Sequence, residues 1–407
     1  MAKKETGLAL YYRRSASVIR IVRFAVLLAF VIFAVYCIGF FSSNLTEDSV
    51  RSVVNSIYRS FDDLTPSETG IKIHTDNSSS FLVMHNDLAV VSNTGVELYA
   101  FSGDKLLEYD YTYSDAAAVT AGEYLFVYDT KGKEIALYNS VAKLFSEEFE
   151  YEVKTACMND MGYFAVVNSE KTYRSGVIVY GPKGGSYGEI FRWMSPDKHI
   201  LSVALNSNAS ELVCSAVFNR NGAFVTELIV YDIATGEKKY SVQLDDTMVM
   251  TLGYADNDSS IYALADGRFF SFDKSLEQKG LSEFNRSNAK FFKKADNAFI
   301  VSQTNNLSGN SMTVNVFDYA AKPVVVFKTD KKVLDAEYFG SRLYVLYKDS
   351  LVIYDCEDGK AKETATLPLD IQYKAVRTDG YGRYILVGAK TALRGTVENL
   401  IGDEGEK

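Results

Sequence analysis

Short runs of alternating hydrophobic and polar residues recur along most of the chain, and seven of them end in an aromatic residue that is usually followed by aspartate. These residues are Tyr99, Tyr138, Tyr180, Tyr231, Phe272, Phe317 and Tyr354. The first and the last are 255 residues apart (354 − 99). Six intervals therefore give a mean period of about 42 residues, the length of one four-stranded propeller blade. A single blade cannot bury both of its faces, whereas blades packed around a ring can, so the pattern predicts an all-β fold, a β-propeller.

Each repeat reads as four strands separated by turns, and the strand upstream of the aromatic residue is strongly apolar, as in Leu212 to Val217 before Tyr231. A further set of strands, from Lys374 to Arg394, follows the seventh repeat and lacks a fourth strand. Ile71 to His74, before the first repeat, is a strand without a blade. Pairing these two segments would close the ring and remove exposed sheet edges. We therefore expect an eight-bladed propeller over residues 70–400, with seven blades as the alternative if the C-terminal unit is vestigial.

The repeated aromatic residue and the residues after it fit structural roles. In the clearest copy, Tyr231 is followed by Asp232 and then by Thr235 and Gly236. The aromatic ring can fill the gap between neighbouring blades, the carboxylate can accept hydrogen bonds from a turn, and glycine tolerates a positive φ. We therefore expect these residues in the core and in turns.

An uncharged segment near the N-terminus predicts a membrane anchor. Phe24 to Phe41 carries no charge over 18 residues. As a helix it would be ~27 Å long, close to the ~30 Å thickness of bilayer hydrocarbon, and residues 18–41 together are long enough to span it. A cleavable signal peptide is the alternative, but bulky Phe40 and Phe41 stand where a cleavage site needs small residues.

The flanking charges predict the orientation of this anchor. Residues 1–23 carry six basic side chains and one acidic side chain, a net charge of +5 (6 − 1). The positive-inside rule then places a basic tail, residues 1–17, in the cytoplasm and exports everything after residue 41. The expected address is the cell membrane, with a single pass and the propeller outside.

Residues 42–69 predict an amphipathic stalk helix and linker between the anchor and the ring. Leu45, Val50, Val53, Val54 and Ile57 recur at three- and four-residue spacing. This apolar face could dock on the propeller, pair with a second copy of the chain, or lie on the membrane surface. Residues 401–407 form an acidic C-terminal tail.

The net charge argues against a nucleic-acid partner, and the cysteine count argues against disulfide bonds. The whole chain has a net charge of −9, so the part after residue 23 carries −14 (−9 − 5). Nucleic acids and anionic polymers are repelled by such a surface, and no nucleic-acid partner is expected. Of the four cysteines, Cys37 lies in the predicted anchor and leaves an odd number outside, which argues against a disulfide framework. The others are expected in blade cores.

The sequence contains no strong motif for catalysis, metal binding or cofactor binding. His74, His85 and His199 are far apart in sequence and belong to no metal-binding or nucleophile motif. Residues 256–260 (Asp-Asn-Asp-Ser-Ser) resemble the start of a calcium loop but lack its glycine and closing glutamate, so a polar hairpin turn is expected. Residues 183–185 (Lys-Gly-Gly) lie between strands and read as a turn. We assign no catalytic, cofactor-binding or metal-binding residue, expect no cofactor, and interpret the protein as a non-enzyme.

The segment from Tyr231 to Tyr240 resembles the repeat of quinoprotein-like propellers, with Tyr240 at the position of their tryptophan; the chain has one tryptophan, Trp193. The Tyr-Asp and Phe-Asp pairs also resemble Trp-Asp (WD40-like) repeats, without the Gly-His partner of that signature. Taken whole, the chain resembles an uncharacterised family of membrane-anchored propellers from Gram-positive, clostridia-like bacteria. This resemblance implies an extracytoplasmic address and no known activity.

Three functional hypotheses follow. The first is a non-enzymatic extracytoplasmic binding or scaffold protein, anchored in the cytoplasmic membrane, which holds a protein partner on one propeller face. The second is an extracytoplasmic sensor that signals through its single span. The third is a cofactor enzyme of the quinoprotein type, which would need stacking aromatic residues, cationic groups and a calcium site in the channel.

Overall fold

A computed structural model describes residues 22–24, 26–28, 70–76, 78–100, 102–183, 186–255, 257–378, 382–398 and 400. The chain divides into two compact units, Met1–Asp62 and Asp63–Lys407. In the first unit the described residues, 22–24 and 26–28, are helical. None of the helices within the described residues has the length and apolar character needed to cross a membrane.

Four predicted segments fall wholly or mostly outside the described residues. They are the basic tail 1–17, the anchor 18–41 apart from its two short helical stretches, the stalk and linker 42–69, and the acidic tail 401–407. Each of these assignments stays a prediction.

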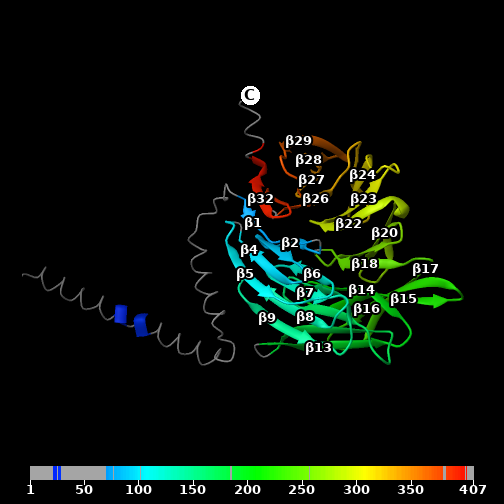
Figure 1. Cartoon of the computed structure of the whole chain (residues 1–407). Helices are drawn as coiled ribbons and strands as arrows, with labels where there is room; N and C mark the ends of the chain where they lie inside the picture. The colour runs from blue at the N-terminus through cyan, green and yellow to red at the C-terminus, as the bar shows by residue number, and fades with distance from the viewer. Residues whose placement is uncertain are drawn as a thin grey trace, which may run out of the picture. The chain divides into compact units, whose positions relative to one another are not determined.

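The described part of the second unit forms eight four-stranded antiparallel sheets that follow one another around a ring (Figure 1). The eight-bladed propeller expected from the repeats is thus confirmed, and the seven-bladed alternative is not adopted. Blades are numbered 1 to 8 in chain order. In seven of them the four strands are consecutive in sequence, and blade 8 combines the last three strands with the first.

The strands fall into four concentric sets, from the channel outward. The first strands are β2 (Ser80–Met84), β6 (Ala116–Ala121), β10 (Val153–Met158), β14 (His199–Leu205), β18 (Val249–Tyr254), β22 (Ala289–Ala295), β26 (Asp335–Phe339) and β30 (Ala375–Thr378). The second strands are β3 (Asp87–Val91), β7 (Tyr124–Asp129), β11 (Phe164–Asn168), β15 (Glu211–Arg220), β19 (Ser260–Ala265), β23 (Ala298–Thr304), β27 (Arg342–Leu346) and β31 (Arg383–Val387).

The third strands carry the repeated aromatic residues and are β4 (Gly95–Tyr99), β8 (Glu134–Asn139), β12 (Ser175–Lys183), β16 (Ala223–Asp232), β20 (Arg268–Asp273), β24 (Met312–Asp318), β28 (Ser350–Glu357) and β32 (Thr391–Thr396). The outer strands are β5 (Lys105–Asp110), β9 (Lys143–Glu148), β13 (Ser186–Ser195), β17 (Lys238–Asp245), β21 (Gln278–Glu283), β25 (Pro323–Thr329), β29 (Lys360–Pro368) and β1 (Ile71–Lys72). A short 3-10 helix, η1 (Arg286–Asn288), precedes β22.

The ring closes through β1, as the sequence predicts. Ile71 pairs with Ala392 of β32, so the N-terminal strand completes blade 8. In Figure 1 the blue β1 lies beside the red β32. The guanidinium of Arg394 reinforces the closure, because it donates hydrogen bonds to the backbone carbonyls of Tyr99 and Ala100 in blade 1. The first and last strands of the ring are therefore hydrogen-bonded to each other, and the outer side of β32 is paired.

Hydrophobic side chains fill all eight interfaces between neighbouring blades. The repeated aromatic residue of each blade faces the preceding blade: Tyr99 packs with Ile385 of blade 8, and Tyr138 packs with Val91 of blade 1. Six of the seven repeated aromatic residues are buried, and Tyr354 is half-buried between blades 6 and 7. The expected core role of the repeat is confirmed.

A β-bulge accompanies every one of these seven aromatic residues. The ladder between the third and the outer strand shifts register at that position in blades 1 to 7. In blade 4, Val230 pairs with Tyr240 while Tyr231 pairs with Lys238, so Lys239 is the extra residue. A bulge bends the strand and increases its twist, which turns the outer strand of each blade.

In blades 2, 4, 5 and 6 the side chain of the residue after the aromatic residue accepts hydrogen bonds from the turn. Asp232 accepts hydrogen bonds from the backbone N–H and the hydroxyl of Thr235, at 2.9 and 3.2 Å, and Gly236 has a φ of +73°. In blade 5, hydrogen bonds from Ser275 and from the turn backbone lower the pKa of Asp273 to about 2. Blade 7 differs, because Asp355 pairs with Arg342 of the adjacent strand at 3.1 Å.

Blade 8 fills the aromatic position in another way. Gly395 stands where the other third strands carry the aromatic residue, and its partner on β31 is Tyr384. A Cβ atom on Gly395 would lie 2.2 Å from the Tyr384 hydroxyl, so the ring of Tyr384 occupies this space. Tyr384 packs against blade 7, which is the role the third-strand ring has elsewhere.

Candidate functional site

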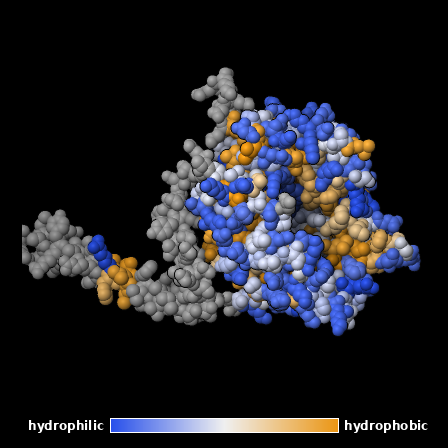
Figure 2. All heavy atoms as spheres, in the orientation of Figure 1, coloured by the Kyte–Doolittle hydropathy of each residue, from blue (hydrophilic) through white to orange (hydrophobic). Residues whose placement is uncertain are grey.

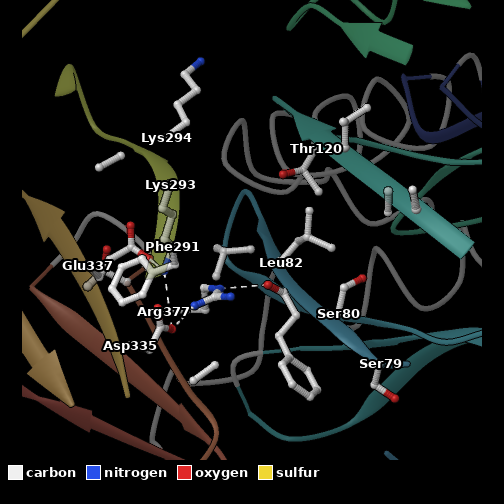
Figure 3. Close-up of a pocket in the computed structure, with 18 of the residues that line it drawn as sticks. Ser79, Ser80, Leu82, Thr120, Phe291, Lys293, Lys294, Asp335, Glu337 and Arg377 are labelled. Carbon is white, nitrogen blue, oxygen red and sulfur yellow. Dashed lines mark hydrogen bonds and ion pairs between the residues drawn. The ribbon is translucent and has the colours of Figure 1, made fainter. Parts of the chain in front are cut away.

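The first strands of five blades line a cavity of about 1390 Å3. Its walls come from β2, β6, β22, β26 and β30, which belong to blades 1, 2, 6, 7 and 8. Figure 3 shows part of this central channel, and Figure 2 shows a largely hydrophilic face interrupted by hydrophobic patches. A central cavity of this volume is the first candidate for a binding site in a ring of blades.

A cluster of four charged residues occupies one wall of the channel. The Lys293 ammonium lies 2.5 Å from a carboxylate oxygen of Glu337 and 3.6 Å from one of Asp335. The Arg377 guanidinium lies 2.6 Å from the same oxygen of Asp335. All four side chains are less than 20% exposed. The two positive and two negative charges compensate each other at short range.

This charged cluster joins four blades. Lys293 of blade 6 also donates to the backbone carbonyl of Val376 in blade 8, at 3.3 Å. Arg377 of blade 8 donates to the carbonyl of Phe81 in blade 1, at 2.8 Å, as the dashed line in Figure 3 shows. Asp335 belongs to blade 7 and accepts the backbone N–H of Val376. The cluster therefore spans the seam at which the ring closes.

The electrostatics of the cluster favour a structural role over proton transfer. Burial raises the pKa of Glu337, and the positive charges of Lys293 and Arg377 oppose that rise. Each charged group already has an oppositely charged partner, so neither acid is left to act alone on a ligand.

We expect Asp335→Ala to lower the free energy of unfolding by about 3 kcal/mol, at the lower end of the cost of breaking a buried ion pair. Its removal leaves Lys293 and Arg377 with a single compensating carboxylate. The control Asp197→Ala removes an exposed carboxylate before β14 and should change the value by less than about 0.5 kcal/mol. Denaturant titration of the full-length chain measures both, and equal midpoints for Asp335→Ala and the parent would contradict the role given to the cluster.

Two neighbouring side chains at the cavity stand apart from this cluster. Phe292 and Lys294 alternate with Phe291 and Lys293 along β22, so they point to the opposite side of the strand. Figure 3 shows Lys294 directed away from the cluster. Phe292 is 38% exposed, and its ring lies 5.8 Å from that of Phe284. An apolar ring beside an exposed ammonium is a surface suited to contact with another molecule.

The histidines that the sequence offers are not brought together by the fold. His74 follows β1, His85 lies in the hairpin after β2, and His199 begins β14 in blade 4. Ser195 is buried and accepts the backbone N–H of Lys198. Among the described residues there is no group of three or more His, Cys, Asp or Glu side chains that could hold a metal ion.

The aspartate-rich segment 256–260 and the glycine-rich segment 183–185 each lie at the connection between two consecutive strands of one blade. Asp258 accepts hydrogen bonds from the backbone N–H and hydroxyl of Ser207, which joins the hairpins of blades 4 and 5. Lys183 ends β12 and Ser186 begins β13, with residues 184–185 outside the described residues. The polar hairpin turn expected at residues 256–260 is thus confirmed for its described part.

The three described cysteines and the tryptophan belong to blade interfaces. Cys157, Cys214 and Cys356 are free thiols, and burial raises the pKa of Cys157 to about 12, which makes it a poor nucleophile. Trp193 lies on the outer strand β13, with its ring 4.9 Å from that of Tyr231. It is therefore in a blade interface and not at the channel.

Sequence reasoning missed the charged cluster of the channel. One local signal was available: Asp335 and Glu337 are two residues apart on a strand, which puts both carboxylates on one side. The partners Lys293 and Arg377 come from other blades, 42 residues to either side of Asp335 (335 − 293; 377 − 335), so their meeting depends on the closed ring.

Comparisons with known proteins agree with the fold. A sequence profile of a family of unknown function, DUF5711, matches residues 58–393. The comparison with curated proteins finds no match. Sqt1 from Saccharomyces cerevisiae superimposes with a TM-score of 0.55 at 10% identity, over 80% of this chain and 99% of that chain. Sqt1 from Chaetomium thermophilum, in a crystal structure bound to the N-terminus of the ribosomal protein L10, gives a TM-score of 0.51 at 12% identity, over 81% and 100%. At such identities the likeness establishes a β-propeller fold.

Proposed function

The chain belongs to the family of unknown function DUF5711, and we propose that it is a non-enzymatic binding or scaffold protein. In this proposal residues 18–41 anchor it in the cytoplasmic membrane, the propeller lies outside the cell, and a protein partner docks at the mouth of the central channel. The basic N-terminal flank and the uncharged segment after it support the address.

The observation that carries the proposal is that Phe292 and Lys294 are both exposed on the same side of β22 at the channel cavity. The cavity, at about 1390 Å3, is larger than the ~300–1,000 Å3 of typical small-molecule pockets and admits a polypeptide segment. The charged side chains nearby already form ion pairs with one another, whereas Phe292 and Lys294 are exposed. Aromatic side chains are enriched at protein interfaces, so Phe292 is the apolar anchor of this surface, and Lys294 adds a positive charge beside it.

A precedent supports the use of the fold in this way. The propeller of Chaetomium Sqt1 has been crystallised with the N-terminus of a ribosomal protein bound to it. We extend to the present ring only the kind of occupant, a polypeptide segment, and the acidic exterior argues against a nucleic-acid partner.

The test is crosslinking of intact protoplasts with an amine-reactive reagent that does not cross the membrane. If the propeller is outside, its exposed lysines react; if it is inside, they stay unmodified until the cells are lysed. Among the reacted lysines, Lys294 should form crosslinks to a partner polypeptide, whereas Lys328 and Lys362 on outer strands should carry mainly single modifications.

Two results separate the parts of the proposal. Unmodified propeller lysines in intact protoplasts would contradict the extracytoplasmic address. Modified lysines with partner crosslinks confined to the outer strands would retain the address and contradict docking at the channel.

A further inference from the structure

A second cavity, of about 360 Å3, opens between blades 1 and 2 and is lined by four tyrosines. Tyr109 comes from β5, Tyr111 and Tyr113 from the segment after it, and Tyr138 from β8. The volume lies within the range of pockets for small ligands, roughly 300–1,000 Å3. This inter-blade pocket is separate from the central channel, whose lining residues it does not share.

The aromatic walls are held in place by the fold. The rings of Tyr111 and Tyr113 stack with their centroids 4.0 Å apart, and those of Tyr109 and Tyr138 lie 5.5 Å apart at 42°. The backbone N–H groups of Tyr111 and Tyr113 donate to carbonyls in the hairpin between β3 and β4, at 3.1 and 2.8 Å. A pocket whose walls are fixed in advance loses little freedom when a ligand enters.

The charges around the pocket select for a cation. Four carboxylates and one ammonium line it, for a net charge of −3 (1 − 4): Asp110, Glu134, Glu147, Glu148 and Lys143. Burial raises the pKa of Tyr111, Tyr113 and Tyr138, so their rings stay neutral and present uncharged π faces. The face of an aromatic ring attracts a cation, and acidic groups around several rings add to that attraction.

Lys143 already places a cation against one of the aromatic rings of the pocket. Its ammonium lies 5.5 Å from the centroid of the Tyr109 ring, within the distance at which a cation interacts with a ring face. Lys143 is exposed, so its ammonium is a tethered competitor that an incoming cation can displace.

Tyr111, one of the residues that line the pocket, has a polar atom without a partner among the described residues. The hydroxyl oxygen of Tyr111 is buried and forms no hydrogen bond with any described residue. A buried hydroxyl without a partner is unfavourable, and a ligand that accepts its hydrogen bond removes that cost.

We propose that the inter-blade pocket binds a small organic cation of the quaternary-ammonium class that also carries a hydrogen-bond acceptor. The methylated ammonium lies against the rings of Tyr109 and Tyr138 and near the carboxylates, and the acceptor receives the hydroxyl of Tyr111. A strongly hydrated metal ion would gain little from tyrosine faces, and an anion would be repelled by the carboxylates.

The test is calorimetric titration of the full-length chain, in a non-ionic detergent, with choline, tetramethylammonium and dimethylbutanol, the neutral isostere of choline. Both cations should bind saturably, with a Kd on the order of 1 mM or tighter, and dimethylbutanol should not. Tyr111→Phe should weaken choline binding several-fold and leave tetramethylammonium binding unchanged, because only choline has a group that accepts the hydroxyl.

Matched variants test the walls of the pocket. Tyr109→Leu keeps an apolar side chain but removes the ring and should weaken both cations about tenfold. Glu148→Gln should weaken both cations, while Glu123→Gln, an exposed acid of the same blade outside the pocket, should have no effect. Lys143→Ala removes the internal competitor and should strengthen binding several-fold, which a purely structural lysine would not do.

Three outcomes overturn the proposal: no saturable binding of either cation, equal binding of dimethylbutanol, or unchanged cation binding in both Tyr109→Leu and Glu148→Gln. Thermal unfolding of each variant without ligand shows that the chain is folded, so a loss of binding cannot be confused with a loss of structure.

Discussion

A chain truncated before Lys374 should lose the cooperative unfolding of the whole ring, not the stability of one blade. The truncation removes β30, β31 and β32, which are three of the four strands of blade 8. Strand β1 then has no partner, and the hydrophobic clusters that blade 8 shares with blades 7 and 1 are lost together. Repeat architectures are stabilised mainly by contacts between neighbours, and here both neighbours are affected.

We expect the melting temperature of the truncated chain to fall by more than about 10 °C, or its cooperative transition to disappear. Truncation after Leu400 retains every described strand and serves as the control. Calorimetry of the two truncated chains and the parent measures the effect. A chain lacking residues 374–407 that melts like the parent would contradict closure of the ring by β1.

Tyr231→Ala should lower the free energy of unfolding by about 3–5 kcal/mol, the usual cost of removing a large buried side chain. Tyr231 is 7% exposed and packs against Trp193 and Phe191 of blade 3, with ring centroids 4.9 and 5.8 Å away. Its loss opens a cavity between blades 3 and 4. Tyr231→Phe keeps the ring and should cost much less.

The neighbouring Asp232→Ala is the matched comparison, because it removes exposed hydrogen bonds of a turn and leaves the core intact. Its loss of stability should be clearly smaller than that of Tyr231→Ala. Denaturant titrations of the three variants provide the ranking. An unchanged denaturation midpoint together with abolished partner binding in Tyr231→Ala would place the repeat residues in a functional surface instead of the core.

The fold was largely predictable from the sequence because its signals are local. Each aromatic residue marks the end of a third strand, and the unpaired strands at the two ends of the ring, near Ile71 and Thr391, complement each other. The expectation that the aspartate after the aromatic residue holds its turn was wrong in blade 7. There Asp355 pairs with Arg342 on the adjacent strand β27. Residue spacing along the chain does not encode which of its neighbours such a carboxylate contacts.

Other features needed the three-dimensional ring. In blade 8 the aromatic side chain of Tyr384 takes the place of the missing third-strand aromatic residue. The sequence does not reveal this, because Tyr384 lies on the adjacent strand β31. The channel cluster depends on Lys293, Asp335 and Arg377 meeting from three blades. The inter-blade pocket likewise combines tyrosines of two blades. Such sites depend on the closure and twist of the sheets, which hydrophobic alternation does not report.

The most direct test of docking at the channel compares two matched double variants of blade 6. Phe292→Ser with Lys294→Glu changes an exposed apolar residue and a lysine on the first strand, and Val326→Ser with Lys328→Glu makes the same changes on the outer strand. The measurement is the amount of the crosslinked partner recovered with each folded variant from intact cells. Our account predicts that the first-strand variant retains less than about a tenth of the partner, as expected for loss of central contacts, and that the outer-strand variant retains nearly all of it. Equal retention by the two variants, or loss from the outer-strand variant alone, would contradict it.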